Sequence, residues 1–140
     1  MNKKVLSIVA IIIVVLLGSY TFINMNKGKA DKEVVGETIK VTHRQGETEV
    51  KKNPKRVAVL DFGSIDTLDK FGVDVIALPK KGLPSYLEKY KDDKYIDLGS
   101  LKEFSMEKLN EAKPDLIIIE GRQAEYYDEL SKIAPTILLG

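Results

Sequence analysis

The sequence predicts an α/β fold, in which a doubly wound parallel sheet follows an N-terminal β-hairpin and a transmembrane or signal helix. Three observations predict it. Short apolar runs alternate with amphipathic segments of helical length, which is the pattern of parallel βαβ units. A stretch of alternating apolar and polar residues precedes them, as in a half-exposed hairpin. A long segment without charged residues, residues 5–23, lies near the N-terminus.

The N-terminal segment predicts an anchor rather than part of a core. Residues 1–4 include two lysines and predict a cytoplasmic n-region, and residues 5–23 carry no charge. That length lies between a signal-peptide core and a spanning helix, which needs about 20 apolar residues. Because no convincing A-x-A-like cleavage site is present, a retained signal anchor is favoured over a cleaved signal peptide. The lysines place the remainder outside the cytoplasm, and the polar residues 24–36 predict a tether.

The first part of the domain, which we expect to span residues 37–140, is predicted to be a β-hairpin. Thr38–Thr42 and Thr48–Lys51 alternate apolar and polar residues on either side of a turn. Gly46 supplies the turn with a position that tolerates positive φ. Pro54, which donates no backbone hydrogen bond, then separates the hairpin from the rest.

The apolar runs that follow predict strands buried on both faces, because they do not alternate. The predicted strands are Val57–Leu60, Val73–Leu78, Tyr95–Leu98, Asp115–Ile119 and Ile137–Leu139. The segments between them carry helix start and stop signals. The predicted helices run from a Ser64 cap to Gly72, from Pro84 to about Tyr90, from a Ser105 cap to Pro114, and from about Gln123 to Ile133.

Composition and motifs exclude several functions. The chain has no cysteine, so a disulfide, a thiolate nucleophile or a thiolate metal site is impossible. His43 is the only histidine and lies on the predicted hairpin, without a second ligand or catalytic partner. Neither phosphate-binding glycine motif is present, so an enzyme on a flavodoxin-like sheet is disfavoured, and no cofactor or metal is expected. A net charge of +1 with a single basic block at Lys51–Arg56 argues against nucleic acid as a partner.

Arg122 is the strongest candidate for a ligand contact. Ligands of open α/β sheets bind beyond the carboxyl ends of the strands. The segments predicted to lie there are Asp61–Ser64, Pro79–Pro84 and Glu120–Gln123. Arg122 falls at the opening of a predicted helix beside Gly121, where charge and backbone donors would together hold an anion. The alternative is that Arg122 pairs with Glu120, Glu125 or solvent.

Other polar groups near this edge have simpler interpretations. Asp61, Asp66 and Asp69 could form a carboxylate cluster for metal or phosphoryl chemistry. Asp66, however, is predicted in the first helical turn, where the helix dipole favours an acid, so a structural role is preferred for this group. Lys80-Lys81 is interpreted as a solvated turn.

Four segments of the chain carry a likeness to a known family. They are K-N-P-K-R-V-A-V-L-D-F-G-S-I-D-T-L at Lys52–Leu68, D-D-K-Y-I-D-L-G-S-L-K-E-F-S-M-E-K-L at Asp92–Leu109, K-P-D-L-I-I-I-E-G-R-Q at Lys113–Gln123 and Y-D-E-L-S-K-I-A-P-T-I at Tyr127–Ile137. Together they resemble the first lobe of iron-siderophore substrate-binding proteins of ABC importers, and most of all the Gram-positive proteins for petrobactin and other catecholate-type siderophores. The likeness implies a protein of two lobes that clamp the ligand between them.

The resemblance also implies roles for single residues. The arginine of the G-R-Q stretch, which is Arg122, would contact an anionic ferric siderophore. Gly121, Gln123 and Ser64 lie on the same predicted edge and are candidate contacts with it. In this family a glutamate of each lobe docks on the permease, and the first-lobe glutamate matches Glu107. A second interpretation of Glu107 is a first-turn acid next to its helix cap.

The chain departs from the family pattern in two ways. Lipoproteins of the family carry a lipidated cysteine after L-x-G, whereas this chain has Leu16-Leu17-Gly18-Ser19, which favours a retained helix as anchor. The chain also stops about where the linker to a second lobe would begin, so a truncated first lobe is expected. The leading hypothesis is an importer component that captures ferric siderophore at the extracytoplasmic face of the cell membrane. The alternative is a membrane-tethered single lobe that does not transport, surviving as a gene fragment or an interaction module.

Overall fold

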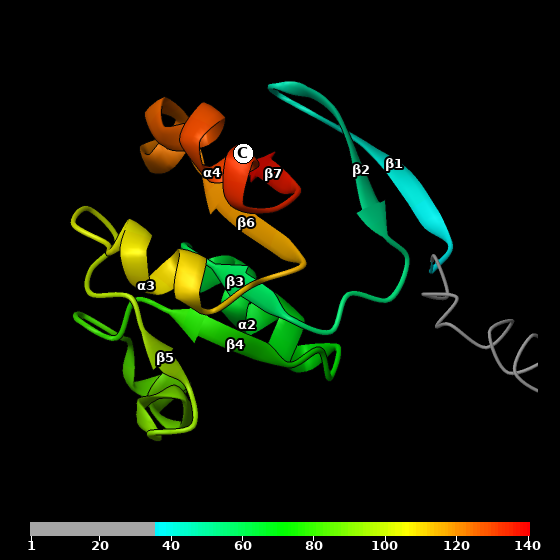
Figure 1. Ribbon diagram of the computed structural model, residues 1–140. Coiled ribbons are helices and arrows are strands. Elements are labelled where there is room, and N and C mark those ends of the chain that lie inside the picture. Colours follow the sequence, from blue (N-terminus) through cyan, green and yellow to red (C-terminus); the bar gives the residue numbers. More distant parts are fainter. Residues whose placement is uncertain (1–35) are drawn as a thin grey trace, which may run out of the picture. The chain divides into compact units, whose positions relative to one another are not determined.

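Five parallel strands form the central sheet of the computed structural model, which describes residues 36–140 (Figure 1). The predicted n-region, anchor helix and nearly all of the tether, residues 1–35, lie outside the described residues. Within residues 36–140, no helix is both long and apolar enough to cross a membrane.

The strand order β5-β4-β3-β6-β7 confirms the doubly wound sheet. The strands are β3 (Val57–Val59), β4 (Val75–Leu78), β5 (Ile96–Asp97), β6 (Leu116–Glu120) and β7 (Thr136–Leu139). The chain starts at β3 in the centre, moves outward through β4 to β5, and returns to place β6 on the other side of β3. All four pairings are parallel. The direction of winding therefore reverses between β3 and β6, and this switch point is where ligands bind in open α/β sheets.

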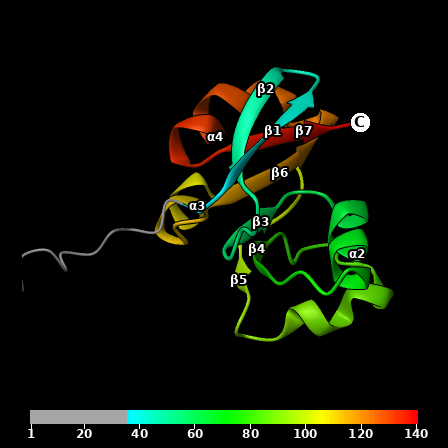
Figure 2. The same cartoon turned by 90° about the vertical axis from the view of Figure 1, so that its right-hand side faces the viewer.

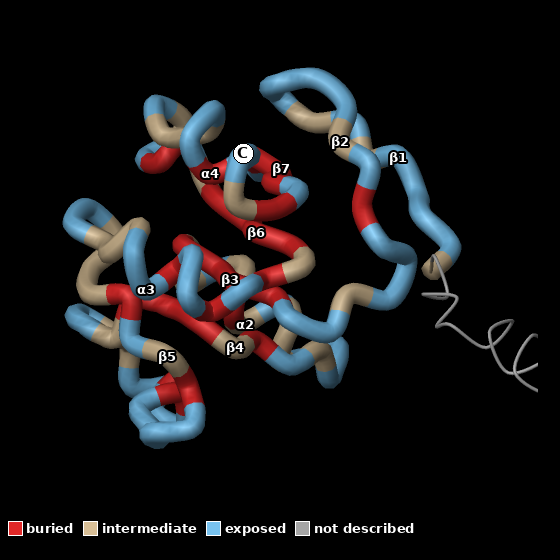
Figure 3. Tube along the Cα trace, viewed as in Figure 1, coloured by how far each residue is buried: buried red, intermediate tan, exposed pale blue. Residues whose placement is uncertain are grey.

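Each face of the sheet has its own apolar core, because alternate strand residues point to opposite faces. Val57 and Val59 of β3 belong to one core, and Ala58 and Leu60 belong to the other. The first face is covered by α2 (Phe62–Lys70), η2 (Ser85–Lys91) and the hairpin, and the second by α3 (Met106–Glu111) and α4 (Tyr127–Ile133). Figure 3 shows the buried residues concentrated along the strands, as the apolar runs predict.

The hairpin covers the outer part of the sheet beside β7 (Figure 2). Its strands are β1 (Thr38–His43) and β2 (Gly46–Lys51), joined by a shorter turn than predicted, with Gly46 at φ +121°. Arg44 Nη1 donates to the carbonyl of Gly140 at 2.7 Å, and the backbone N–H of Leu138 donates to Nδ1 of His43 at 3.4 Å. The lone histidine therefore fastens the hairpin to an edge strand, away from the switch point.

Two predicted details of α2 are wrong. The helix begins at Phe62, and Asp61 rather than Ser64 is its N-cap, since Oδ2 of Asp61 accepts from the N–H of Ser64 at 2.7 Å. Asp66 consequently lies beyond the first turn, where it pairs with Lys70 at 3.4 Å. Asp61 and Ser64 can both cap a helix, and Asp61 takes the position because β3 ends at Val59, just before it.

Other helix boundaries follow the prediction more closely. Oγ of Ser105 accepts from the N–H of Lys108 at 3.1 Å, which confirms this cap. Gly72 ends α2 with φ +69°, the left-handed conformation that favours glycine. The single helix predicted from Gln123 to Ile133 is instead a 3₁₀ segment, η3 (Gly121–Tyr126), followed by α4. The segment after Pro84 is likewise 3₁₀ rather than α.

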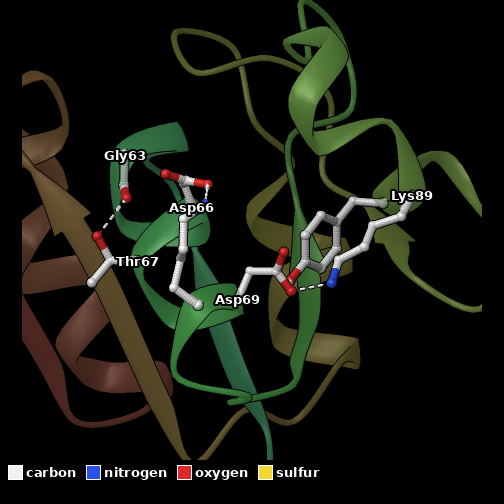
Figure 4. A network of polar contacts seen from close by, with 7 residues as sticks. Gly63, Asp66, Thr67, Asp69 and Lys89 are labelled. Carbon is white, nitrogen blue, oxygen red and sulfur yellow. Dashed lines mark hydrogen bonds and ion pairs between the residues drawn. The ribbon is translucent and has the colours of Figure 1, made fainter.

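Asp69, the second acid within α2, ties the helix to η2 (Figure 4). Asp69 pairs with Lys89 and accepts from the hydroxyl of Tyr90 at 3.4 Å. The Lys89 hydrogen bond holds the pKa of the Asp69 carboxyl below its usual value, and burial raises the pKa of Tyr90 to about 12. At neutral pH the pair is thus a carboxylate and a neutral phenol donor. Asp61, Asp66 and Asp69 all have structural partners, and residues 36–140 contain no acid cluster able to hold a metal.

Candidate ligand-binding site

A hollow of about 480 Å³ opens at the carboxyl edge of the sheet, beside the switch point. Its walls come from the segments that follow β3, β4, β5 and β6. It is lined by Phe62, Lys81, Gly82, Ser100, Leu101, Lys102, Glu103 and Arg122. The position agrees with the rule for open α/β sheets, since the strands of all four segments end at this edge.

The charge of the hollow is predominantly positive. Lys81, Lys102 and Arg122 face one acid, Glu103. All four side chains are exposed, and none of them forms an ion pair with another residue of the described range 36–140. Cations that are not neutralised by the protein remain available to an anionic ligand. The arrangement therefore suits a molecule with several negative charges.

Another hollow, of about 440 Å³, lies at the opposite edge, where the strands begin. Its cations are Lys52, which pairs with Glu37 at 2.9 Å, and Lys55. Its lining also includes the acid Asp74, and it lies at the edge of the sheet opposite the ligand-binding edge of the switch point. Position and charge both favour the carboxyl-edge hollow as the ligand site.

The backbone around Arg122 is fixed by Glu120. The Glu120 carboxylate caps η3 by accepting from the N–H of Arg122, at 3.3 Å, and from the N–H of Gln123. The expectation that helix N–H groups here would hold an anion therefore needs correction, because these two donors are already used. What the segment offers a ligand is the guanidinium of Arg122, which projects from a capped and well-defined turn.

Of the four predicted ligand contacts, only Arg122 lines the hollow. Gly121 is exposed beside it, and Ser64 is half-buried within α2. Gln123 is buried, with 1% of its surface exposed, and both ends of its amide bind backbone groups. Contact of Gly121, Gln123 or Ser64 with a ligand stays a prediction, and the bonds of Gln123 favour a role in holding the site together.

Sequence reasoning missed the segment Ser100–Glu103, which contributes half of the lining residues. It follows β5, so the same rule that singled out the other three segments could have found it. The sequence places Lys81 at the correct edge but predicts a solvated turn there, whereas the structure has Lys81 in the lining of the hollow.

Hydrogen bonds hold the backbone of Ser100–Glu103 in place. The N–H of Ser100 donates to the carbonyl of Glu103 at 3.0 Å, and the N–H of Glu103 donates to Oγ of Ser100 at 2.9 Å. The N–H of Lys81 donates to the carbonyl of Gly99 at 2.9 Å, which joins the segment after β4 to the segment after β5. Gly99 has φ +103°. The three cations are thus carried on backbone segments that are bonded to one another.

The chain matches the family model described as "Periplasmic binding protein" over residues 57–140. It is 49% identical over 144 residues to the petrobactin-binding protein YclQ of Bacillus subtilis. The match covers 100% of this chain and 45% of that protein. The crystal structure of YclQ gives a TM-score of 0.73, with 60% identity over 74% of this chain and 38% of that one.

Two further relatives come from other bacteria. The ferric-anguibactin-binding protein FatB of Vibrio anguillarum is 41% identical over 100 residues, 71% of this chain and 31% of its own. The catecholate-siderophore binding protein VctP of Vibrio cholerae has a TM-score of 0.68 and 48% identity, over 73% of this chain and 37% of its own.

The chain spans less than half the length of these relatives. The matched part nevertheless includes the whole parallel sheet from β3 to β7 and the segments that line the hollow. The relatives are siderophore-binding proteins by name, and the sequence and the fold of this chain are similar to theirs. The chain therefore belongs to the periplasmic binding protein family, where it matches the first lobe of siderophore-binding proteins of ABC importers.

Proposed function

We propose that this chain forms the first lobe of the substrate-binding component of an ABC importer, which captures a ferric siderophore, of the catecholate type, outside the cytoplasm. Residues 5–23 would hold it at the membrane. The observation that carries the proposal is the group of three unneutralised cations, Lys81, Lys102 and Arg122, around a hollow at the switch point. Binding of a neutral solute would not require three cations without partners in the site.

The chemistry of the ligand fits this group. Catecholate oxygens on ferric iron leave a complex with several negative charges spread over a rounded, rigid surface. Hydrogen bonds between ionised partners are about twice as strong as neutral ones, and electrostatic attraction also speeds encounter. YclQ, FatB and VctP are described as binding petrobactin, ferric anguibactin and catecholate siderophores, which supports the same ligand class here.

The proposal is tested by titrating the full chain, held in detergent micelles, with gallium petrobactin and following backbone amides by NMR. Gallium replaces ferric iron without paramagnetic broadening. We expect saturable shifts at Gly82, Leu101 and Arg122, and no shifts at Gly72 and Asp74 on the opposite edge. Adding the ferric complex should then broaden the same signals. Shifts that are absent, or that occur equally at both edges, would contradict the proposed site and function.

We also propose that Glu107 contacts the importer's permease. It lies in the first turn of α3, is exposed, and forms no ion pair with the part of the chain described. Replacing it with arginine should weaken binding to a permease of a petrobactin importer by about tenfold or more, since opposed like charges are costly. Affinity for gallium petrobactin should not change, because Glu107 does not line the hollow.

The matched control is Glu111→Arg, which makes the same change at the other, also exposed, end of α3. The two variants are compared by biolayer interferometry, which measures their binding to the permease in nanodiscs. If both weaken the complex equally, the effect is one of net charge and Glu107 has no special role.

A further inference from the structure

The side chain of Gln123 links two walls of the hollow. Its Nε2 donates to the carbonyl of Leu101 at 2.7 Å, and its Oε1 accepts from the N–H of Glu120 at 3.2 Å. Only 1% of the residue is exposed, so water cannot easily replace either bond. Leaving a buried polar group unpaired is costly, which makes both bonds strong constraints on the local backbone.

These bonds act directly on two of the ligand-facing cations. The carbonyl of Leu101 and the N–H of Lys102 belong to one planar peptide unit. The hydrogen bond from Gln123 to this carbonyl therefore fixes the position of the backbone nitrogen of Lys102. On the other wall, Gln123 follows Arg122 in the turn that Glu120 caps. One amide therefore connects the backbone that carries Arg122 with the backbone that carries Lys102.

We propose that Gln123 is a positioning residue, which sets the separation of Arg122 and Lys102 for a rigid, multiply anionic ligand. This inference rests on the proposed function and gives Gln123 a role through other residues instead of direct contact. Two cations held at a fixed separation lose little freedom when such a complex binds, and this preorganisation contributes affinity without a new contact.

A second link makes the role separable from folding. The ring of Phe104 meets the ring of Tyr126 edge to face, with centroids 5.3 Å apart, and holds the end of the same loop against η3. The N–H of Ser105 also donates to the carbonyl of Leu98 at 2.8 Å. With these contacts in place, losing the Gln123 bonds should loosen the peptide before Lys102 and leave the rest of the loop attached.

The test uses Gln123→Met in the full chain, a change that keeps the volume and removes both bonds. We expect affinity for gallium petrobactin to fall about tenfold, with backbone NMR order parameters lowered at Lys102 and unchanged at Lys81. Gln123→Asn serves as a second variant if the first does not fold, because it keeps the amide but is one methylene too short to bridge both walls.

A double-mutant cycle separates positioning from a general loss of stability. If Gln123 acts by placing Lys102, then Lys102→Ala costs much less affinity in the Gln123→Met background than in the parent, whereas Lys81→Ala costs the same in both. Equal cost of Lys102→Ala in both backgrounds, or unchanged affinity in Gln123→Met, overturns the inference. If the parent itself binds no siderophore, the proposed function fails, and the order parameters at Lys102 alone then decide whether Gln123 orders this wall.

Discussion

Replacing Arg122 with glutamate should reduce the affinity for gallium petrobactin by about 10–100-fold, since a hydrogen bond to a charged partner contributes about 1.5–3 kcal/mol. The variant loses a charge-assisted donor and places a second acid beside Glu103 in the hollow. The fold should be unaffected, because the guanidinium has no partner among residues 36–140 and the Glu120 cap binds only the backbone of this residue.

The control for this change is Lys55→Glu. Lys55 is an exposed cation at the amino edge of the sheet, so the variant has the same formal net charge as Arg122→Glu but an unaltered ligand hollow. Isothermal titration of both variants, at two salt concentrations, distinguishes a local contact from overall attraction. If Lys55→Glu weakens binding as much as Arg122→Glu does, the hollow is not where the ligand lies.

The sheet could be predicted because its physical cause is local. A strand buried on both faces has to be apolar throughout, and Val57–Leu60 and Leu116–Ile119, the apolar part of the predicted strand Asp115–Ile119, satisfy this requirement within a few residues. The parallel pairing of the strands followed from their alternation with helical segments, whereas their order in the sheet comes from the structure. Helix starts were less certain: Asp61 and Ser64 are both good caps, and only the end of β3 decides between them.

The site was less predictable, because tertiary bonds define it. The hairpin's place over β7 depends on bonds that join residues far apart in sequence, such as Arg44 to Gly140. The wall Ser100–Glu103 follows a strand of only two residues and is shaped by the amide of Gln123. Arg122 was identified through its place after β6, whereas the function of Gln123 depends on a partner in another loop that no local pattern indicates.

Replacing Gly99 with alanine should be the most damaging single change to the site. A Cβ at this position would lie 2.7 Å from the backbone carbonyl oxygen of Glu103, and the residue has φ +103°. The conformation alone costs a non-glycine residue about 1–3 kcal/mol. Because the obstacle is backbone rather than a flexible side chain, the clash adds about 1–3 kcal/mol more, as overpacking does.

Gly46→Ala isolates the clash from the backbone strain. Gly46 has a comparable φ of +121° with no atom within 4 Å of its Cβ position, and it lies in the hairpin, away from the hollow. Urea unfolding should therefore show a larger loss of stability for Gly99→Ala than for Gly46→Ala. Only Gly99→Ala should also weaken gallium petrobactin binding, because the bond from Lys81 to Gly99 and the Ser100–Glu103 wall must shift together. If the two variants lose the same stability and bind with the same affinity, the backbone of Ser100–Glu103 adjusts to the new Cβ at little cost. A backbone that adjusts so easily could not hold Lys81, Lys102 and Arg122 in a fixed arrangement.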